Sequence, residues 1–220
     1  MATAPTGPFT GFSDETTIFF VGLEADNSRT YWQDHRELWE RSVRAPMAAL
    51  TAELAPDFGP AKVFRPHRDV RFSADKSPYK TQQGAVVQHP GGAGGWYVQV
   101  SADGLMVGGG MIQPARDQLA RYRAAVDAER TGERLAAVVD QLTARGWTLM
   151  GDRLARAPRG VAPDHPRVEL LRHKSIAARH DHGDPDWFTT RECLERVTAG
   201  WRELDPFLHW LGEHVGPAQP

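Results

Sequence analysis

The stretch WYVQVSADGLMVGGGMI, residues 96–112, indicates the fold class of this chain. It predicts two short strands, joined by the turn-forming tripeptide Ala-Asp-Gly. The segment GAVVQHP, residues 84–90, precedes it and predicts a further strand, which the glycine-rich run PGGAGG separates from the first two. Consecutive short strands with such connections are typical of an antiparallel meander.

Helical patterns lie on both sides of these strands. At the N-terminal end, Ser13 is expected to cap a first helix, and Pro46 suits the first turn of a later one. Segments 114–129 and 134–146 predict two middle helices, and segments 147–152 and 174–178 predict short strands. An amphipathic helical tail follows, with a break expected near Asp205 and Pro206. The core-facing residues of the first helix are expected to be Ile18, Phe19, Phe20 and Leu23.

The order of these elements predicts an α+β fold. We expect a central antiparallel sheet that is flanked by N-terminal, middle and C-terminal helices. The length of 220 residues fits one domain, and neither an internal repeat nor a clear linker divides the chain. We therefore expect a flexible N-terminus over residues 1–12 and a single domain over residues 13–215.

Composition places the chain among ordinary globular proteins. Apolar residues make up 40% of it and charged residues 25%. A single cysteine, Cys193, excludes an internal disulfide and a CxxC site, and it lies in a predicted helix as a packing residue. Neither a basic leader nor an apolar stretch of about 20 residues is found, so we expect a cytoplasmic location and no membrane partner.

Charge is concentrated in one segment. Residues 62–80 contain six lysines and arginines against two aspartates, a net charge of +4, although the whole chain carries −2. A local cluster on an acidic body indicates an anion site, and it disfavours nucleic acid as a partner. Val70 and Phe72 alternate with polar neighbours there, which predicts a half-buried strand over residues 67–73.

The basic segment contains the candidate functional residues. Cations at the end of such a strand could hold a phosphate or carboxylate. Asp69 and Asp75 are candidates for an orienting carboxylate or a base, and Tyr79 for a stacking or proton-donating group. The candidate ligand-binding residues are Arg68, Arg71, Ser73, Lys76 and Lys80.

Two other interpretations of the same residues stay open. In the first, Arg71 pairs with Asp69 or Asp75 and the segment is an internal charge network, which a glutamate would have to complete; Glu15, Glu24 and Glu37 are the candidates. In the second, the segment docks an acidic protein partner. The sequence identifies no reaction, no cofactor and no oligomeric state.

Two further motifs have residue types that occur in ligand sites. His180 and His182 have a His-x-His spacing that could begin a zinc or iron site. The site lacks a third ligand of known position, for which His67, His165 and His173 are candidates, and the run equally fits a surface loop. The glycines 108–110 lack the spacing of a phosphate loop. They more plausibly let a neighbouring chain or a ligand approach a strand closely.

The segment RDVRFSADKSPYK, residues 68–80, resembles the domain of unknown function 2461 family. That family is recognised by the string Arg-Asp-x-Arg-Phe-Ser-x-Asp-Lys-x-Pro-Tyr-Lys, which is matched here at every fixed position. The strand leading to VGGGMIQP and the segments APRGVAPDHP and LLRHKSI are also similar to it. The resemblance implies a compact α+β domain, and it implies no activity and no catalytic residue.

Overall fold

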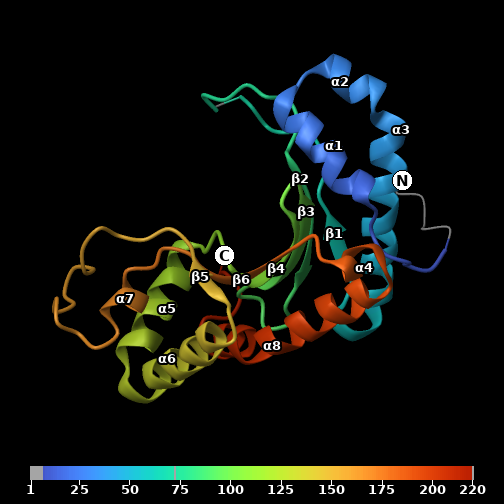
Figure 1. Ribbon diagram of the computed structural model, residues 1–220. Coiled ribbons are helices and arrows are strands. Elements are labelled where there is room, and N and C mark those ends of the chain that lie inside the picture. The colour runs from blue at the N-terminus through green and yellow to red at the C-terminus, as the bar shows by residue number, and fades with distance from the viewer. Residues whose placement is uncertain (1–6, 72, 220) are drawn as a thin grey trace. The chain divides into compact units, whose positions relative to one another are not determined.

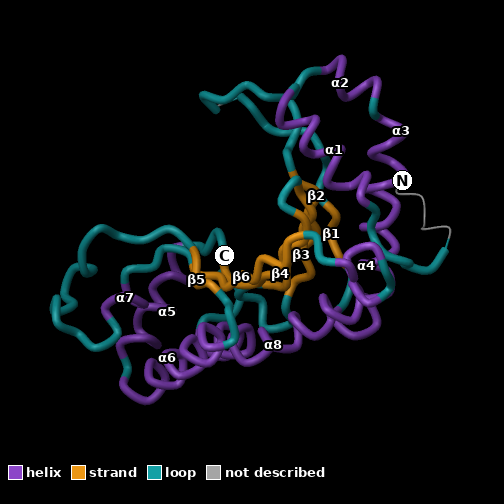
Figure 2. Tube along the Cα trace, viewed as in Figure 1, coloured by secondary structure: helices purple, strands orange, loops and turns teal. Residues whose placement is uncertain are grey.

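The computed structural model describes residues 7–71 and 73–219 (Figure 1). Within these residues it confirms the α+β class, with one antiparallel sheet of six strands in the order β1-β2-β3-β4-β6-β5. Figure 2 shows helices before, between and after the strands. The strands are β1 (Ala61–Val63), β2 (Gln82–Gln88), β3 (Gly95–Ser101), β4 (Gly104–Met111), β5 (Thr148–Met150) and β6 (Ile176–Gly183).

The expected meander is confirmed, because β2, β3 and β4 are neighbours in the sheet. Glycines allow β6 to come close to β4. Gly110 has a φ of +149°, and a Cβ atom there would lie 2.4 Å from the Cα atom of Ala177 in β6. The prediction that residues 108–110 permit close approach of a neighbouring chain segment therefore holds at this glycine.

The chain divides into two compact units, each built from three stretches. The first unit contains the residues up to Val87, residues 97–107 and residues 181–199; the second contains residues 88–96, 108–180 and those from Gly200 onward. The borders fall inside β2, β3, β4, β6 and the last helix. No linker marks them, which is why the sequence suggested one domain over residues 13–215.

Helices dominate the start of the first unit. They are α1 (Asp14–Ala25), α2 (Arg29–Asp34), α3 (Arg36–Trp39), a π-helical turn η1 (Glu40–Arg44) and α4 (Ala45–Phe58). The side chain of Ser28 caps α2 by accepting a hydrogen bond from the Tyr31 N–H, 3.1 Å away. Pro46 lies in the first turn of α4, and Gly59 ends that helix with a φ of +99°.

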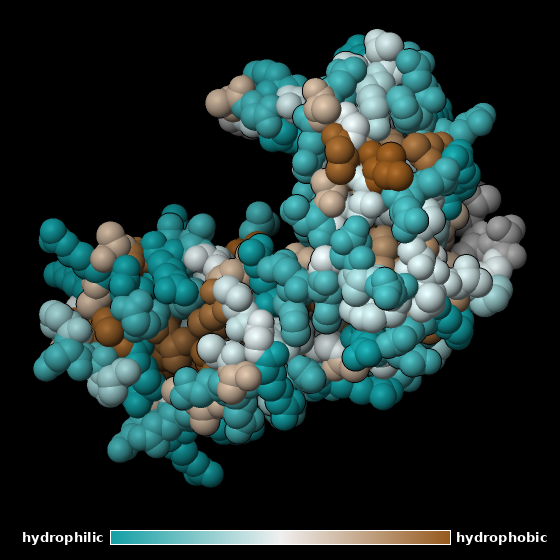
Figure 3. Space-filling view, viewed as in Figure 1, coloured by the Kyte–Doolittle hydropathy of each residue, from teal (hydrophilic) through white to brown (hydrophobic). Residues whose placement is uncertain are grey.

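Ser13 occupies the N-cap position of α1 as expected, but its side chain makes no capping hydrogen bond; instead its N–H donates to the Thr16 hydroxyl. The expected core face is only partly buried. Phe19, Phe20 and Leu23 are buried, whereas Ile18 is 61% exposed. The prediction for Ile18 is wrong because successive helical residues turn by about 100°, so Ile18 lies opposite the buried face. Figure 3 shows apolar side chains on the surface over α1, where Val21 is also exposed.

The described part of the expected flexible N-terminus packs against the first unit. Phe9 and Phe12 are buried, and the Phe12 ring stacks on that of Phe188 at 5.2 Å. The Phe9 N–H donates to Glu53 at 2.6 Å, and Glu53 in turn pairs with Arg191 at 2.5 Å. Residues 1–6 of that segment lie outside the described residues.

The second unit contains α5 (Arg116–Asp127), α6 (Glu129–Ala144), α7 (Val168–Leu171) and most of α8 (Glu192–His214), whereas a short 3-10 turn, η2 (Asp186–Thr189), belongs to the first. The expected break near Asp205 and Pro206 is wrong, because α8 continues through Pro206. Proline removes one helical hydrogen bond, but the fully buried Trp201 and Trp210 lie on either side and their packing outweighs that loss. None of the described helices has both the length and the apolar character needed to cross a membrane.

Candidate functional site

The basic segment forms an arm between β1 and β2 in the first unit. We call residues 64–81 the basic arm; Phe72 within it lies outside the described residues. Figure 1 shows the arm extending past α1. Its base is a narrow ribbon in which the Arg68 N–H donates to Pro78 O at 2.9 Å and the Lys80 N–H donates to Pro66 O at 2.8 Å.

The strand expected over residues 67–73 does not form among the described residues of this range. Only an isolated antiparallel bridge joins His67 to Tyr79. Pro66 and Pro78 flank the bridge and lack the N–H groups that a longer ladder needs, so pairing stops there. Val70 and its polar neighbours therefore lie in a loop, although their alternation is typical of a strand.

Tyr79 anchors the arm to the helical layer of the first unit. The Asn27 side chain donates to Tyr79 O at 3.0 Å and accepts from the Tyr79 N–H at 3.1 Å. The Tyr79 ring stacks on Trp32 at 4.3 Å between centroids and is 6% exposed. Tyr79 therefore has a structural role that explains its aromatic character, beside the proposed role in chemistry.

Two ion pairs stabilise the end of the arm. Arg71 makes a two-pronged contact with Asp69, with Nε–Oδ1 and Nη2–Oδ2 distances of 2.9 and 2.7 Å. Asp75 accepts from the Ser77 hydroxyl at 2.6 Å and pairs with Arg68. These contacts hold the pKa of both aspartates below the usual range: Arg71 has the largest effect on Asp69, and Ser77 followed by Arg68 on Asp75.

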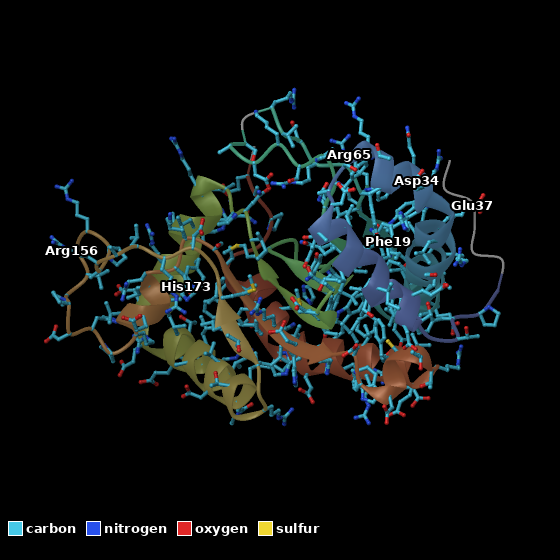
Figure 4. All side chains as sticks on the ribbon, turned by 45° about the horizontal axis from the view of Figure 1, so that its top comes forward. Phe19, Asp34, Glu37, Arg65, Arg156 and His173 are labelled. Carbon is cyan, nitrogen blue, oxygen red and sulfur yellow. The ribbon has the colours of Figure 1, made fainter. Side chains whose placement is uncertain are left out.

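The remaining candidates at the end of the arm contact its backbone. The Lys76 ammonium donates to Val70 O at 3.0 Å, and the Ser73 N–H donates to the same carbonyl at 3.4 Å. The arm therefore has part of the internal charge network considered above. Two of the suggested glutamates do not complete it: Glu15 pairs with Arg41, and Figure 4 shows Glu37 on the side of the helices away from the arm.

A pocket of about 510 Å³ lies at the base of the arm. Its size is within the range of small-molecule sites. Of the predicted ligand-binding residues, Arg68 and Lys80 line it, while Arg71, Ser73 and Lys76 are not among its lining residues. The lining consists of Arg68, Asp69, Tyr79, Lys80, Thr81 and Gln82.

Lys80 has the most unusual environment of the cations in this pocket. Its ammonium lies 5.1 Å from the centre of the Phe64 ring. Burial lowers the pKa of Lys80, and the positive charge of Arg65 lowers it further. Figure 4 shows Arg65 where the arm meets the N-terminal helices. Lys80 therefore carries its charge beside a second cation.

Sequence reasoning missed several neighbours of the pocket. Thr81 and Gln82 directly follow the basic motif, but their residue types gave no signal. Gln82 hydrogen-bonds Tyr97, whose pKa is raised to about 12 by burial. Asn27 and Trp32 could not be connected with the arm, because that contact joins segments about 50 residues apart.

The other candidate motifs do not form a metal centre. His180 and His182 both lie in β6, beyond the strand expected at 174–178. The His180 ring is 5.5 Å from Trp147 and the His182 ring 5.3 Å from Trp187. Among residues 7–71 and 73–219, no three histidine, cysteine or acidic side chains are grouped so that they could hold a metal ion.

The fold and site thus define an α+β protein with a basic arm over a polar pocket. The family described as "Conserved hypothetical protein (DUF2461)" matches residues 15–210, which is most of the chain. The chain belongs to this family, as the motif in the arm suggested. No curated protein matches it.

Proposed function

We propose that the pocket at the base of the basic arm binds an anionic small molecule that carries a phosphate or a carboxylate. The observation that carries this proposal is the position of Lys80. It lines the pocket together with Arg68, and Arg65 lies close enough to oppose its charge. A bound anion would relieve this repulsion and would form charge-assisted hydrogen bonds with the cations.

The ion pair of Arg68 is compatible with ligand binding. Its partner, Asp75, has a side chain that is 56% exposed, and water screens such pairs so that they contribute little to stability. A phosphate offers arginine a two-pronged contact of the same kind. We therefore expect Arg68 to exchange Asp75 for the ligand, so that the network and the ligand site are two states of the same residues.

The proposal is limited to binding. Catalytic acids and bases work best when their pKa is near the working pH. The pKa values of Asp69 and Asp75 are instead lowered by their arginine and serine partners, which keeps both groups ionised and weakly basic. We therefore assign them to holding the arm and the ligand.

A thermal-melt series tests the proposal. Wild-type protein, Lys80→Gln and the control Lys62→Gln are melted with inorganic phosphate, sulfate, citrate and glycerol 3-phosphate. Lys62 is an exposed residue of β1 that does not line the pocket, so the control removes the same charge. An anion at 100 times its Kd adds about 2.7 kcal/mol of stability, which raises the Tm by about 5–11 °C at this size.

We expect at least one anion to raise the Tm of wild type and Lys62→Gln, and to leave Lys80→Gln unchanged. Equal shifts in all three proteins would place the binding elsewhere. The absence of any shift would refute the proposal.

A second candidate function, docking of an acidic protein partner, is favoured by the exposed end of the arm. The Arg71 side chain is 76% exposed, and Lys76 is exposed as well. A fluorescent polyglutamate peptide tests it. Under this alternative, Arg71→Gln weakens a salt-sensitive binding of the peptide and leaves the response to small anions intact.

A further inference from the structure

The chemistry of the pocket lining indicates more than an anion. Besides Arg68 and Lys80, the lining includes three residues with other polar side chains, Asp69, Thr81 and Gln82. The carboxylate only accepts hydrogen bonds, whereas the hydroxyl and amide can both donate and accept. A ligand that satisfies this set carries an anionic group and several hydroxyls.

The one aromatic residue in the lining is not available for base stacking. Tyr79 is 6% exposed, and its ring already stacks on Trp32. Phe64, next to the pocket, has the Lys80 ammonium over its ring. Recognition of nucleobases commonly uses an open aromatic face, so the lining favours a ligand without a base.

The charge of the lining also limits the ligand. Asp69 lines the pocket together with Arg68 and Lys80, and its carboxylate accepts from Arg71. A ligand with several anionic groups would bring one of them against this carboxylate, which disfavours tricarboxylates and nucleoside triphosphates. Hydroxyl groups, in contrast, can donate to it.

We propose that the ligand is a phosphorylated sugar or polyol, with its phosphate held by Lys80 and Arg68 and its hydroxyls by Asp69, Thr81 and Gln82. This inference rests on the proposed anion-binding function, and it adds the ligand class. The pocket volume of about 510 Å³ accommodates a hexose phosphate.

Isothermal titration of the full chain tests the ligand class. The probes are glucose 6-phosphate, ribose 5-phosphate, glycerol 3-phosphate, inorganic phosphate, glucose and AMP. We expect at least one of the three sugar or polyol phosphates to bind about tenfold or more tightly than both inorganic phosphate and AMP, because hydroxyl contacts add to the phosphate contact. Glucose alone should bind far more weakly, since it lacks the group held by the cations.

Two variants separate the two ends of the ligand. Lys80→Gln should abolish binding of both inorganic phosphate and the sugar phosphate. Gln82→Leu should weaken binding of the sugar phosphate about tenfold more than binding of inorganic phosphate. Circular dichroism of each variant verifies the fold.

The outcomes are distinguishable. If inorganic phosphate binds in a Lys80-dependent manner but none of the three sugar or polyol phosphates binds more tightly, the ligand class is wrong and the anion site stands. A preference for AMP would overturn the class in the same way. If no probe binds, the ligand class is wrong, and the citrate arm of the melt series decides whether an anion site remains.

Discussion

Replacing Asn27 with alanine should release the basic arm without unfolding the protein. Asn27 makes two hydrogen bonds to the backbone of Tyr79, and both are partly buried. Each contributes about 1–1.5 kcal/mol, so their loss should cost about 2–3 kcal/mol of arm docking. That cost corresponds to an increase of about 30- to 150-fold in the population of the released arm.

Hydrogen exchange at the Tyr79 amide measures this population directly, because that amide bonds Asn27 in the docked arm. We expect its protection to fall by the same factor in Asn27→Ala, and by less in Asn27→Asp, which keeps the acceptor. Ser28→Ala is the matched control: it removes the cap of α2, at a cost of about 1 kcal/mol, and the hydrogen bond that it removes goes to Tyr31 and not to the arm. Unchanged Tyr79 protection in Asn27→Ala would refute the anchoring role.

Three further changes have defined outcomes. Gly110→Val should destabilise the protein by about 3 kcal/mol or more in urea unfolding, because its Cβ would meet Ala177. Gly183→Ala, which has open space but a φ of +70°, should cost only about 1–2 kcal/mol. Burial raises the pKa of the Cys193 thiol to about 12, so iodoacetamide at pH 8 should label the unfolded protein but not the native protein. Equal labelling rates of the native and the unfolded protein would contradict this. Burial lowers the pKa of His173, so the unfolded state binds a proton at a higher pH than the native state does, and the Tm should fall as the pH drops below about 6.5. The Tm of His173→Asn should depend less on pH, which checks that His173 causes the effect.

Most elements could be predicted because their signals are local. The turn Ala-Asp-Gly, the start of α1 after Ser13 and the proline in the first turn of α4 all act within a few residues. The errors arise where packing overrides a local rule. Pro206 is retained inside α8 by the buried residues around it, and the alternating pattern near Val70 is not a strand because prolines interrupt its pairing.

The candidate site was predictable in its charges and not in its geometry. The basic residues of the arm stand out in the sequence, but nothing in it separates Lys80, at the pocket, from Arg71, at the exposed end. The contacts that decide this difference come from Asn27 and Trp32, far away in the chain. Tertiary contacts of this kind have no periodic signature.

The central claim is that Lys80 receives an anion, and its own titration tests that claim most directly. The pKa of Lys80, followed by NMR of its side chain, should be below the ordinary value of 10.5 in the free protein, because of burial and Arg65. Saturating inorganic phosphate should raise it, and phosphate affinity should weaken as the pH rises through that value and Lys80 loses its proton. A Lys80 pKa that does not respond to phosphate, while phosphate binds, would contradict the account.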